Sequence, residues 1–356
     1  MTSSSLIKRL CDLPGPSGRE EAVAEEIKRE IAPIGADTIT DRMGNVIAVM
    51  RFSADNDSPR KRIMISAHMD EVGFMITEVR SDGTLGISNV GGISDAVLSG
   101  RRVKLMGKQG LIGGVIASKA IHLKEKEERE KAPKIDRLYI DIGAKDADEA
   151  SEHAFVGAYA VFDSEYYEFG EDLVKAKALD DRMGCAAMIE MMRSLKENPI
   201  SANLDVCFCF TVREEIGLSG AKAAAYRIRP DLAIVLETTA IADLPDVAEK
   251  ERVGDVGKGV VVSVMDRSTI YPKEIVTAAL DVAKRENIAA QVKRYISGGN
   301  DAGTIHKTAD GIKTLALSVP TRYLHSPACV ASMNDYKSQK QLCEAIVRSL
   351  ADSEVI

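Results

Sequence analysis

The sequence predicts an α/β protein whose main domain is interrupted by a β-rich insertion. In residues 1–70 and 163–356, apolar strand-like runs alternate with amphipathic helical segments, which is the pattern of βαβ units. Between residues 71 and 162, short β-type runs follow one another with glycine turns between them, which is typical of a small β-sandwich or barrel. We therefore expect a discontinuous main domain, residues 1–70 plus 163–356, with residues 71–162 inserted into it.

The first 70 residues should contain two short helices, a hairpin and a buried strand. Apolar residues recur at helical spacing in residues 5–31, the sequence LPGPSG interrupts them, and Ser17 is the predicted N-cap of the second helix. The sequence around Gly44 predicts the hairpin. The apolar run RIMISA predicts a strand that ends just before His68.

Six short β-type runs predict the strands of the insertion. A single helical stretch, residues 145–154, interrupts them, and the charged segment 123–134 is expected to be a solvated loop. The six runs are residues 72–79, 84–90, 101–107, 111–118, 137–143 and 155–162. After the insertion, four amphipathic segments separated by apolar runs predict the helices of the main domain. They are residues 182–197, 219–228, 272–287 and 335–352.

Composition and charge argue against several classes of partner. The net charge is −7 and the basic residues are scattered, so no nucleic-acid or anionic-membrane partner is expected. No apolar run reaches the roughly 18 residues of a membrane-spanning helix, and the N-terminal sequence lacks the apolar core of a signal peptide. Cys207 and Cys209 alternate with phenylalanines and should lie on one face of a buried strand. A reducing, cytoplasmic setting fits the widely spread cysteines.

Five apolar, strand-like runs each lead to residues that can bind a divalent metal. In open α/β sheets the loops beyond the carboxyl ends of the strands converge on one crevice, so these residues can meet there. Two histidines and several carboxylates in one crevice predict a site for two metal ions and a hydrolytic reaction. The residues are His68 with Asp70, Asp180 with Asp181, Glu214 with Glu215, Glu237, and His325.

The first two pairs each have a chemical and a structural interpretation. His68 and Asp70 lie two residues apart, so both side chains can face the same way at a strand end. His68 is then a candidate zinc ligand, and Asp70 can accept a hydrogen bond from its other ring nitrogen. Taken alone, such a pair could equally lie on the protein surface. Asp180 or Asp181 could simply cap the following helix. Adjacent carboxylates at an apolar strand end repel each other, however, unless a cation compensates them, and a bridging position between two metals would do so.

Glu214 and Glu215 form the most informative pair. One carboxylate could ligate a metal while its neighbour acts as a general base on a water whose pKa the metal lowers from about 15.7 to about 7. Alternatively, the pair could be solvated at a helix start, where it would interact favourably with the helix dipole. Glu237 follows five apolar residues, where a buried charge needs a partner. His325, taken alone, could be a hydrogen-bonded structural histidine.

Five sequence blocks resemble the signature blocks of the M42 aminopeptidases, the group that contains glutamyl and tetrahedral aminopeptidases. The blocks are HMDEVG, LDDRMG, REEIGLSGA, GGNDAG and YLHSP, in the order and spacing of that family. The similarity covers essentially the whole chain, including the position and length of the insertion. It implies a phosphorylase/hydrolase-like catalytic domain, with a mixed sheet in three layers. It also implies an inserted PDZ-like β-barrel that mediates dimer formation within dodecameric shells.

The resemblance also implies the metal ligands. His68, Asp180 and Glu237 would bind one metal, Asp180, Glu215 and His325 would bind the other, and Asp180 would bridge the two. The metals expected from the family are zinc or cobalt.

The remaining roles implied by the resemblance concern residues beside the ligands. Glu214 would be the general base and Asp70 the partner of His68, and the peptide bond between Asp180 and Asp181 can be cis. Two positions depart from the family pattern. Glu237 stands where Asp is usual, so its carboxylate reaches one methylene further, and Asn300 in GGNDAG stands where Thr is more usual.

The predicted function is that of a metallo-exopeptidase, an aminopeptidase that removes N-terminal residues from peptides with a free N-terminus. It would use two divalent metals, a bridging water and Glu214 as the base. Two alternatives remain open at this point: a dinuclear metal-dependent deacylase or carboxypeptidase, and a non-catalytic assembly protein with a residual metal site. A preference for acidic N-terminal residues would need a basic group in the pocket, for which Arg322 is one candidate.

Overall fold

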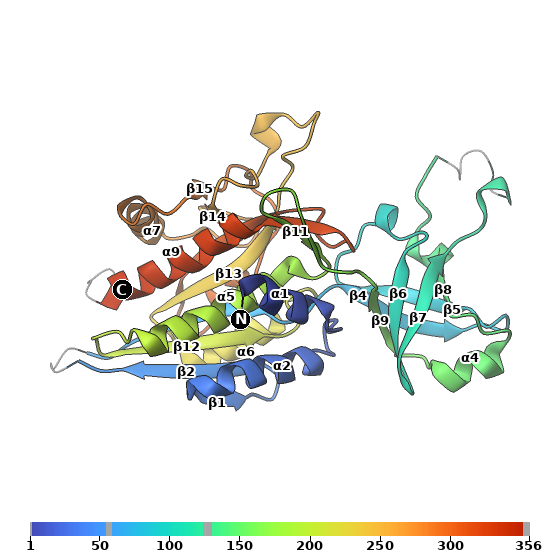
Figure 1. Ribbon diagram of the computed structural model, residues 1–356, viewed down its shortest axis with the longest axis horizontal. Coiled ribbons are helices and arrows are strands. Elements are labelled where there is room, and N and C mark those ends of the chain that lie inside the picture. Colours follow the sequence, from blue (N-terminus) through green and yellow to red (C-terminus); the bar gives the residue numbers. More distant parts are fainter. Residues whose placement is uncertain (1, 55–58, 124, 126–129, 352–356) are drawn as a thin grey trace.

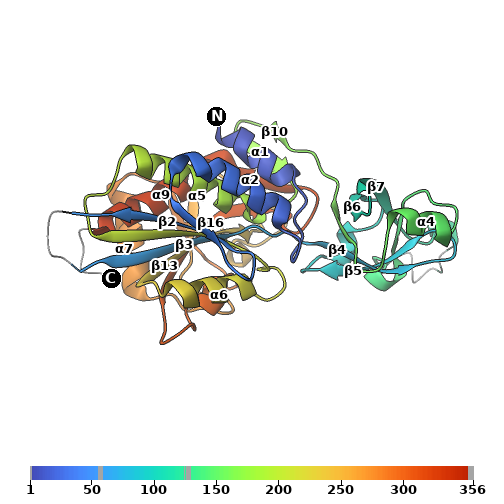
Figure 2. The same ribbon diagram turned by 90° about the horizontal axis from the view of Figure 1, so that it is seen from below.

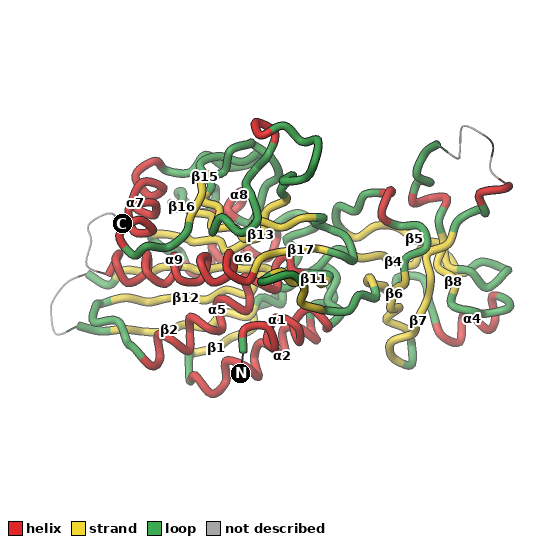
Figure 3. The backbone as a smooth tube through the Cα atoms, turned by 45° about the horizontal axis from the view of Figure 1, so that its top comes forward, coloured by secondary structure: helices red, strands yellow, loops and turns green. Residues whose placement is uncertain are grey.

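An eleven-stranded mixed sheet and a closed six-stranded barrel are formed by the residues that the computed structural model describes, which are 2–54, 59–123, 125 and 130–351. The barrel lies at one end of an elongated molecule, and the large sheet with its helices makes up the rest (Figure 1). Figure 3 shows the barrel strands as a group separate from those of the sheet. Each part has its own cluster of buried apolar side chains. The predicted α/β class with a β-barrel is confirmed.

Four parallel strands form the centre of the large sheet. They lie in the order β12 (Leu204–Thr211), β3 (Lys61–His68), β13 (Leu232–Ala240) and β16 (Lys313–Arg322). Because they are parallel, their carboxyl ends meet at one edge of the sheet. On the β12 side the sheet continues through the antiparallel hairpin of β2 (Val46–Phe52) and β1 (Asp37–Thr40), as predicted around Gly44.

The other side of the sheet is built from short strands beside β16. There the order is β17 (Cys329–Ser332), β11 (Leu173–Ala176) and β10 (Tyr167–Phe169), all antiparallel. Two further strands, β14 (Val260–Val262) and β15 (Ala290–Val292), extend from β16 as a branch.

Helices cover both faces of the sheet (Figure 2). One face carries α1 (Ser3–Asp12), α2 (Glu21–Ile31), α5 (Leu179–Glu197) and α9 (Met333–Ala351), and the other carries α6 (Ser219–Ile228) and the short α8 (Ala302–Ile305). Helix α7 (Lys273–Arg285) packs against α9 and β14. Helix α5 is buried on almost all sides, which explains its many apolar residues. Short 3-10 helices occur at Ala32–Ile34 and Glu249–Glu251.

All six predicted strands of the insertion are present. In chain order they are β4 (Gly73–Val79), β5 (Leu85–Val90), β6 (Arg102–Gly107), β7 (Gly110–Ala117), β8 (Tyr139–Asp141) and β9 (Tyr159–Phe162). They pair in the order β4-β5-β8-β7-β6-β9 and close into a barrel, with α4 (Ala147–His153) as the predicted helix. The rings of Phe74 and Phe162 meet edge to face in its core, with centroids 5.2 Å apart.

The connections of the barrel differ from the prediction in small ways. Three short 3-10 helices, Asp95–Val97, Ile121–Leu123 and Ile135–Arg137, were not predicted. The expected solvated loop 123–134 includes residues 124 and 126–129, which lie outside the described residues.

The predicted role of Ser17 as an N-cap is wrong. Helix α2 begins at Glu21 after Glu20, and no side chain caps it. The Ser17 hydroxyl instead donates a hydrogen bond of 2.6 Å to the buried Asp70 carboxylate. Ser17 lies three residues before the N-cap position Glu20, so its side-chain oxygen does not stand at the helix start, where a capping group accepts hydrogen bonds from the first backbone N–H groups.

Two composition-based expectations can be compared with the structure. Cys207 and Cys209 are buried in β12, as predicted, and the six cysteines are all free thiols. Within the described part of the chain, no helix combines the length and the apolar character needed to cross a bilayer.

Candidate metal centre

The predicted site residues meet at the carboxyl edge of the parallel strands. His68 is the last residue of β3, and Glu214 and Glu215 follow β12. Asp180 lies in the first turn of α5, where the backbone is not helical, and His325 follows β16. These positions agree with the predicted convergence of five segments.

Glu237 differs in one respect from the prediction, because it does not end a strand. Strand β13 continues to Ala240, and Glu237 lies within it, opposite Ser318 of β16. Strand pairing can therefore continue past a buried carboxylate, since the backbone hydrogen bonds do not depend on the side chain. The carboxylate itself has His68 as a partner.

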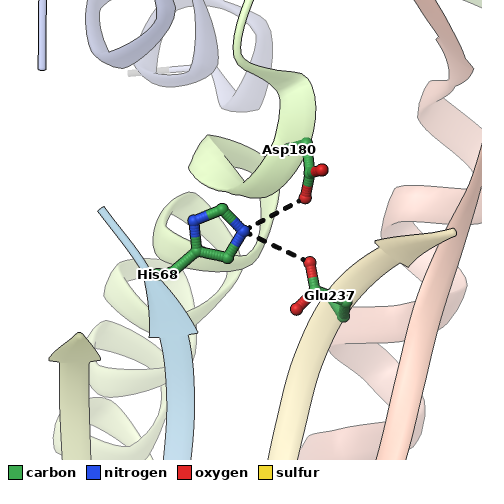
Figure 4. Close-up of side chains that lie close together, drawn as sticks. All are labelled: His68, Asp180 and Glu237. Atoms are coloured by element: carbon green, nitrogen blue, oxygen red, sulfur yellow. Dashed lines mark hydrogen bonds and ion pairs between the residues drawn. The ribbon is translucent and has the colours of Figure 1, made fainter. Parts of the chain in front are cut away.

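The first group of possible ligands consists of His68, Asp180 and Glu237, which point toward one another from β3, α5 and β13 (Figure 4). The Nε2 atom of His68 lies 3.2 Å from Asp180 Oδ1 and 3.4 Å from Glu237 Oε1. The opposite ring nitrogen, Nδ1, lies 3.1 Å from the backbone oxygen of Asp70 and 3.5 Å from its carboxylate. The ring is thus held from behind while Nε2 faces the two carboxylates.

The second group consists of Asp180, Glu215 and His325. His325 Nε2 lies 3.2 Å from Asp180 Oδ2 and 3.2 Å from Glu215 Oε1. Its Nδ1 lies 2.6 Å from the backbone oxygen of Gly92. Asp180 therefore belongs to both groups and offers a different oxygen to each. This is the grouping that the resemblance implied.

The electrostatics of both groups favour a bound cation. Burial by itself would lower the pKa of His68, but the charge of Glu237 and hydrogen bonds to Asp180 and Asp70 raise it well above its ordinary value. Burial likewise opposes the positive charge of His325, yet its bonds to Asp180 and Glu215 raise its pKa to about 11.

The pKa values of the carboxyl groups are also shifted by burial and by the two histidines. Burial raises the pKa of Glu237 to about 8 against the opposing charge of His68. Asp180 is equally buried, but hydrogen bonds from His325 and His68 keep its pKa well below the ordinary value. Each group offers one imidazole nitrogen and two carboxylate oxygens within 4.8 Å of one another, a donor set that suits zinc and related divalent metals. The residues thus fit two such ions.

Glu214 stands beside both groups without belonging to either. Burial raises its pKa well above the ordinary value, and the nearby charges of Glu237 and Asp301 add to this while His68 opposes it. Its backbone N–H donates to Asp70 Oδ1 at 3.0 Å, and the N–H of Glu215 donates to Asp70 Oδ2 at 3.2 Å. A carboxyl group whose backbone is fixed next to the two ligand groups is placed to accept and return a proton in a reaction at this site.

The peptide bond between Asp180 and Asp181 is cis, as the resemblance implied. The two side chains have separate functions. Asp181 accepts a hydrogen bond of 3.0 Å from the backbone N–H of Gly184, which is the capping interaction considered as an alternative for this pair. Asp180 faces the histidines instead.

Several residues that support the site were missed in the sequence. Glu71 forms a buried ion pair with Lys177 at 2.7 Å, and Arg182 Nη2 lies 3.5 Å from the same carboxylate. Lys177 and Arg182 flank Asp180 along the chain, so this network fixes the segment that carries the shared carboxylate. Glu20 accepts hydrogen bonds from the backbone N–H groups of Gly18 and Arg213, directly before Glu214. Glu20 lies in an acidic helical run, which gave no signal that it would be buried.

The structure also gives the contacts of Asn300 and Arg322, two residues considered in the sequence analysis. Asn300, which stands where the family usually has Thr, accepts a hydrogen bond of 2.9 Å from the N–H of Ala302 at the start of α8. A threonine hydroxyl could make the same contact. Arg322 is engaged by Asp243 through two hydrogen bonds of 2.7 Å.

Comparison with known proteins identifies the family of this chain. A family model described as M42 glutamyl aminopeptidase matches residues 44–342. The chain belongs to the M42 peptidase family. It is therefore a hydrolytic, metal-dependent aminopeptidase, as its sequence blocks indicated.

Relatives from bacteria and archaea extend over nearly the whole M42 chain. A putative aminopeptidase from Acetivibrio thermocellus is 39% identical, with 96% of this chain and 97% of the relative covered. A lysyl aminopeptidase from Pyrococcus furiosus is 32% identical, with 98% of each chain covered.

Solved structures show the same fold. A TET aminopeptidase from a marine sediment archaeon, Thaumarchaeota archaeon SCGC AB-539-E09, superimposes with a TM-score of 0.94 at 32% identity, covering 99% of this chain and 98% of the other. The TET1 peptidase of Pyrococcus horikoshii, which can assemble into a tetrahedron or a large octahedral shell, gives a TM-score of 0.86 at 34% identity, covering 98% and 99%.

Proposed function

We propose that this M42 aminopeptidase removes N-terminal residues from peptides with two divalent metal ions, one at His68, Asp180 and Glu237 and the other at Asp180, Glu215 and His325. The observation that carries the proposal is the position of Asp180, whose two carboxylate oxygens face different histidines. A carboxylate shared by two three-residue donor groups supports a dinuclear site more than two separate ones.

Bound ions would act as Lewis acids on the scissile carbonyl and lower the pKa of a water at the site. The protein's own part in the reaction is proton transfer and positioning. Glu214 takes the proton from the attacking water and returns it to the leaving amine. Asp70 holds the backbone of Glu214 and Glu215, so that the base and the neighbouring ligand keep a fixed relation to each other.

The same site chemistry could serve a deacylase or carboxypeptidase, and a pair of substrates separates these activities. A peptide with a free N-terminus should be cleaved from that end, while its N-acetylated counterpart should be left intact. Cleavage of the blocked peptide alone would reject the aminopeptidase assignment. Absence of turnover on both peptides after loading with metal would favour a non-catalytic assembly protein.

Zinc or cobalt is the proposed metal, because each group offers one imidazole and two carboxylates, and this donor set suits both metals. The test uses protein stripped with a chelator and reloaded with zinc, cobalt or manganese. Two ions should bind per chain, and a panel of aminoacyl chromogenic substrates should regain turnover with the preferred metal. The panel also reports which N-terminal residue is preferred. Arg322 is not a strong candidate for binding an acidic residue, since Asp243 already neutralises it.

The barrel supports a proposal about assembly. We assign residues 71–162 as a dimerisation domain and residues 1–70 plus 163–356 as the catalytic domain, with dimers assembling into a dodecamer. The related TET1 peptidase can assemble into a tetrahedron or a large octahedral shell, and the barrel projects from one end of the molecule (Figure 1). Light scattering should give the mass of twelve chains, and a chain lacking the barrel should not form dimers. The six free, buried thiols are consistent with a reducing cytoplasm as its location.

A further inference from the structure

The turn that follows β5 in the barrel reaches into the proposed metal centre. Gly92 lies in this turn, and its backbone oxygen is 2.6 Å from Nδ1 of His325. The barrel therefore contributes a contact to a ligand of the large sheet. His68 differs in this respect, because the oxygen behind its Nδ1 belongs to Asp70, two residues further along the same segment.

Gly91, in the same turn, lies beside Glu215, which belongs with His325 to the second group of proposed ligands. Its φ is +85°, and a Cβ atom added there would lie 2.8 Å from Val72 Cγ1 and 3.3 Å from Glu215 Cβ. No side chain larger than hydrogen fits unless Val72, Glu215 or the turn itself moves. Of the group Asp180, Glu215 and His325, His325 therefore contacts the Gly91–Gly92 turn through Gly92, and Glu215 lies close enough that a Cβ atom at Gly91 would press against it.

His325 needs such a contact more than His68 does. The side chain of His325 is 30% exposed, whereas that of His68 is 1% exposed. Packing alone fixes a buried ring, but a partly exposed ring can rotate unless its second nitrogen is held by a hydrogen bond. The backbone at His325 also has a φ of +57°, so it lies in a turn and not in a strand.

We propose that the Gly91–Gly92 turn of the barrel is a positioning element for the metal held by Asp180, Glu215 and His325. The Gly92 carbonyl accepts the proton of His325 Nδ1, which leaves the Nε2 lone pair directed toward Asp180 and Glu215. The metal held by His68, Asp180 and Glu237 has no such dependence on the barrel. This inference rests on the proposed dinuclear site.

The test compares two glycine substitutions in the barrel. Gly91→Ala introduces both a strained φ and a collision with Val72 and Glu215. Gly143→Ala introduces the same kind of strain at a φ of +81°, where nothing lies within 4 Å of the added Cβ. Chelator-stripped protein is titrated with Co²⁺ and followed by calorimetry and by visible absorption. Gly91→Ala should weaken one of the two binding steps by about 10–100-fold and leave the other unchanged. Gly143→Ala should leave both steps as in the wild type.

The outcomes separate the two proposals. Equal cobalt affinities in Gly91→Ala and the wild type, with two ions bound by each, would overturn the role of the turn alone. Fewer than two ions bound by the wild type would overturn the dinuclear site and this inference with it. If Gly91→Ala fails to fold by circular dichroism, neutron diffraction of the zinc-loaded wild type decides. A deuteron on His325 Nδ1 facing the Gly92 oxygen supports the role of the turn, and its absence refutes it.

Discussion

The carboxylate of Asp70 accepts a hydrogen bond of 3.0 Å from the backbone N–H of Glu214. Asp70, which lies behind the proposed ligand His68, therefore also fixes the backbone of the proposed base, which follows the neighbouring strand β12. Its second oxygen accepts from the N–H of Glu215 and from the hydroxyl of Ser17. A single buried carboxylate thus connects three segments of the site.

Replacing Asp70 should therefore impair both metal binding and catalysis. Asp70→Asn leaves only one acceptor oxygen and removes the negative charge, so we expect kcat/KM to fall by about 10–100-fold and metal affinity to fall with it. Ser17→Ala is the matched control, because it removes one hydrogen bond to Asp70 and leaves both backbone contacts in place. It should have a much smaller effect. Equal effects of the two substitutions would contradict this role of Asp70.

Glu214→Gln should separate the chemical step from metal binding. The amide keeps the size of the side chain but cannot accept the proton of an attacking water, so kcat should fall by about 10²–10⁴-fold. Metal content, measured by mass spectrometry of the elements, should stay near that of the wild type, since Glu214 belongs to neither ligand group. Substantial turnover by this variant would eliminate Glu214 as the base.

Glu237→Asp tests the departure from the family's usual residue. Shortening the side chain by one methylene draws the carboxylate back toward β13 and away from His68 Nε2, which is now 3.4 Å from it. The affinity for one of the two metal ions should fall, and the preference between zinc and cobalt should change. Competitive titration with the two metals measures both effects. Unchanged affinity and preference would show that the extra methylene has no function at this site.

Removing Glu71 from its buried ion pair with Lys177 should reduce the stability of the fold more than removing Lys177. Glu71→Gln leaves Lys177 and Arg182 buried together without their shared carboxylate, so the free energy of unfolding should fall by about 3–5 kcal/mol. Lys177→Met should cost less, because Arg182 remains near Glu71. Urea unfolding of both variants measures the difference. A larger loss for Lys177→Met would contradict this order.

A pH dependence of stability is expected at Asp335, which belongs to neither proposed ligand group. Burial raises its pKa to about 6, although the N–H groups of Gly257 and Gly259 oppose this. The folded state then binds more protons than the unfolded state between about pH 4 and pH 6, so this group's contribution to stability is lost as the pH rises through that window. Relative to Asp335→Asn, the wild type should lose up to about 2–3 kcal/mol across it. Parallel curves for the two proteins would contradict the raised pKa.

The strands, and the polar residues that follow them, could be predicted from the sequence. Apolar runs predicted the strands, and the polar residues that follow them gave the candidates His68, Asp180, Glu214, Glu215 and His325. Parallel strands bring their carboxyl ends together whatever their order in the sheet, so the convergence needed no knowledge of the topology.

The partners of those residues could not be predicted. Glu71 and Lys177 are 106 positions apart, and Gly92 and His325 are 233 positions apart, so no local pattern links them. The contact through Gly92 uses a backbone oxygen, which every residue has. Ser17 was predicted to cap a helix, but that helix begins only at Glu21, and the hydrogen bond from the Ser17 hydroxyl to Asp70 joins residues 53 positions apart.

The order of the ligands along the chain controls when activity can arise during synthesis. His68 precedes the barrel, and the other ligands follow it, with His325 coming after the last of the four central strands. The barrel closes through contacts within a single stretch of chain, so it can fold while the rest is still being translated. The second ligand group, in contrast, cannot exist until β16 and the turn after it have left the ribosome. If the reaction needs the proposed second metal, a chain that still lacks His325 would have no aminopeptidase activity.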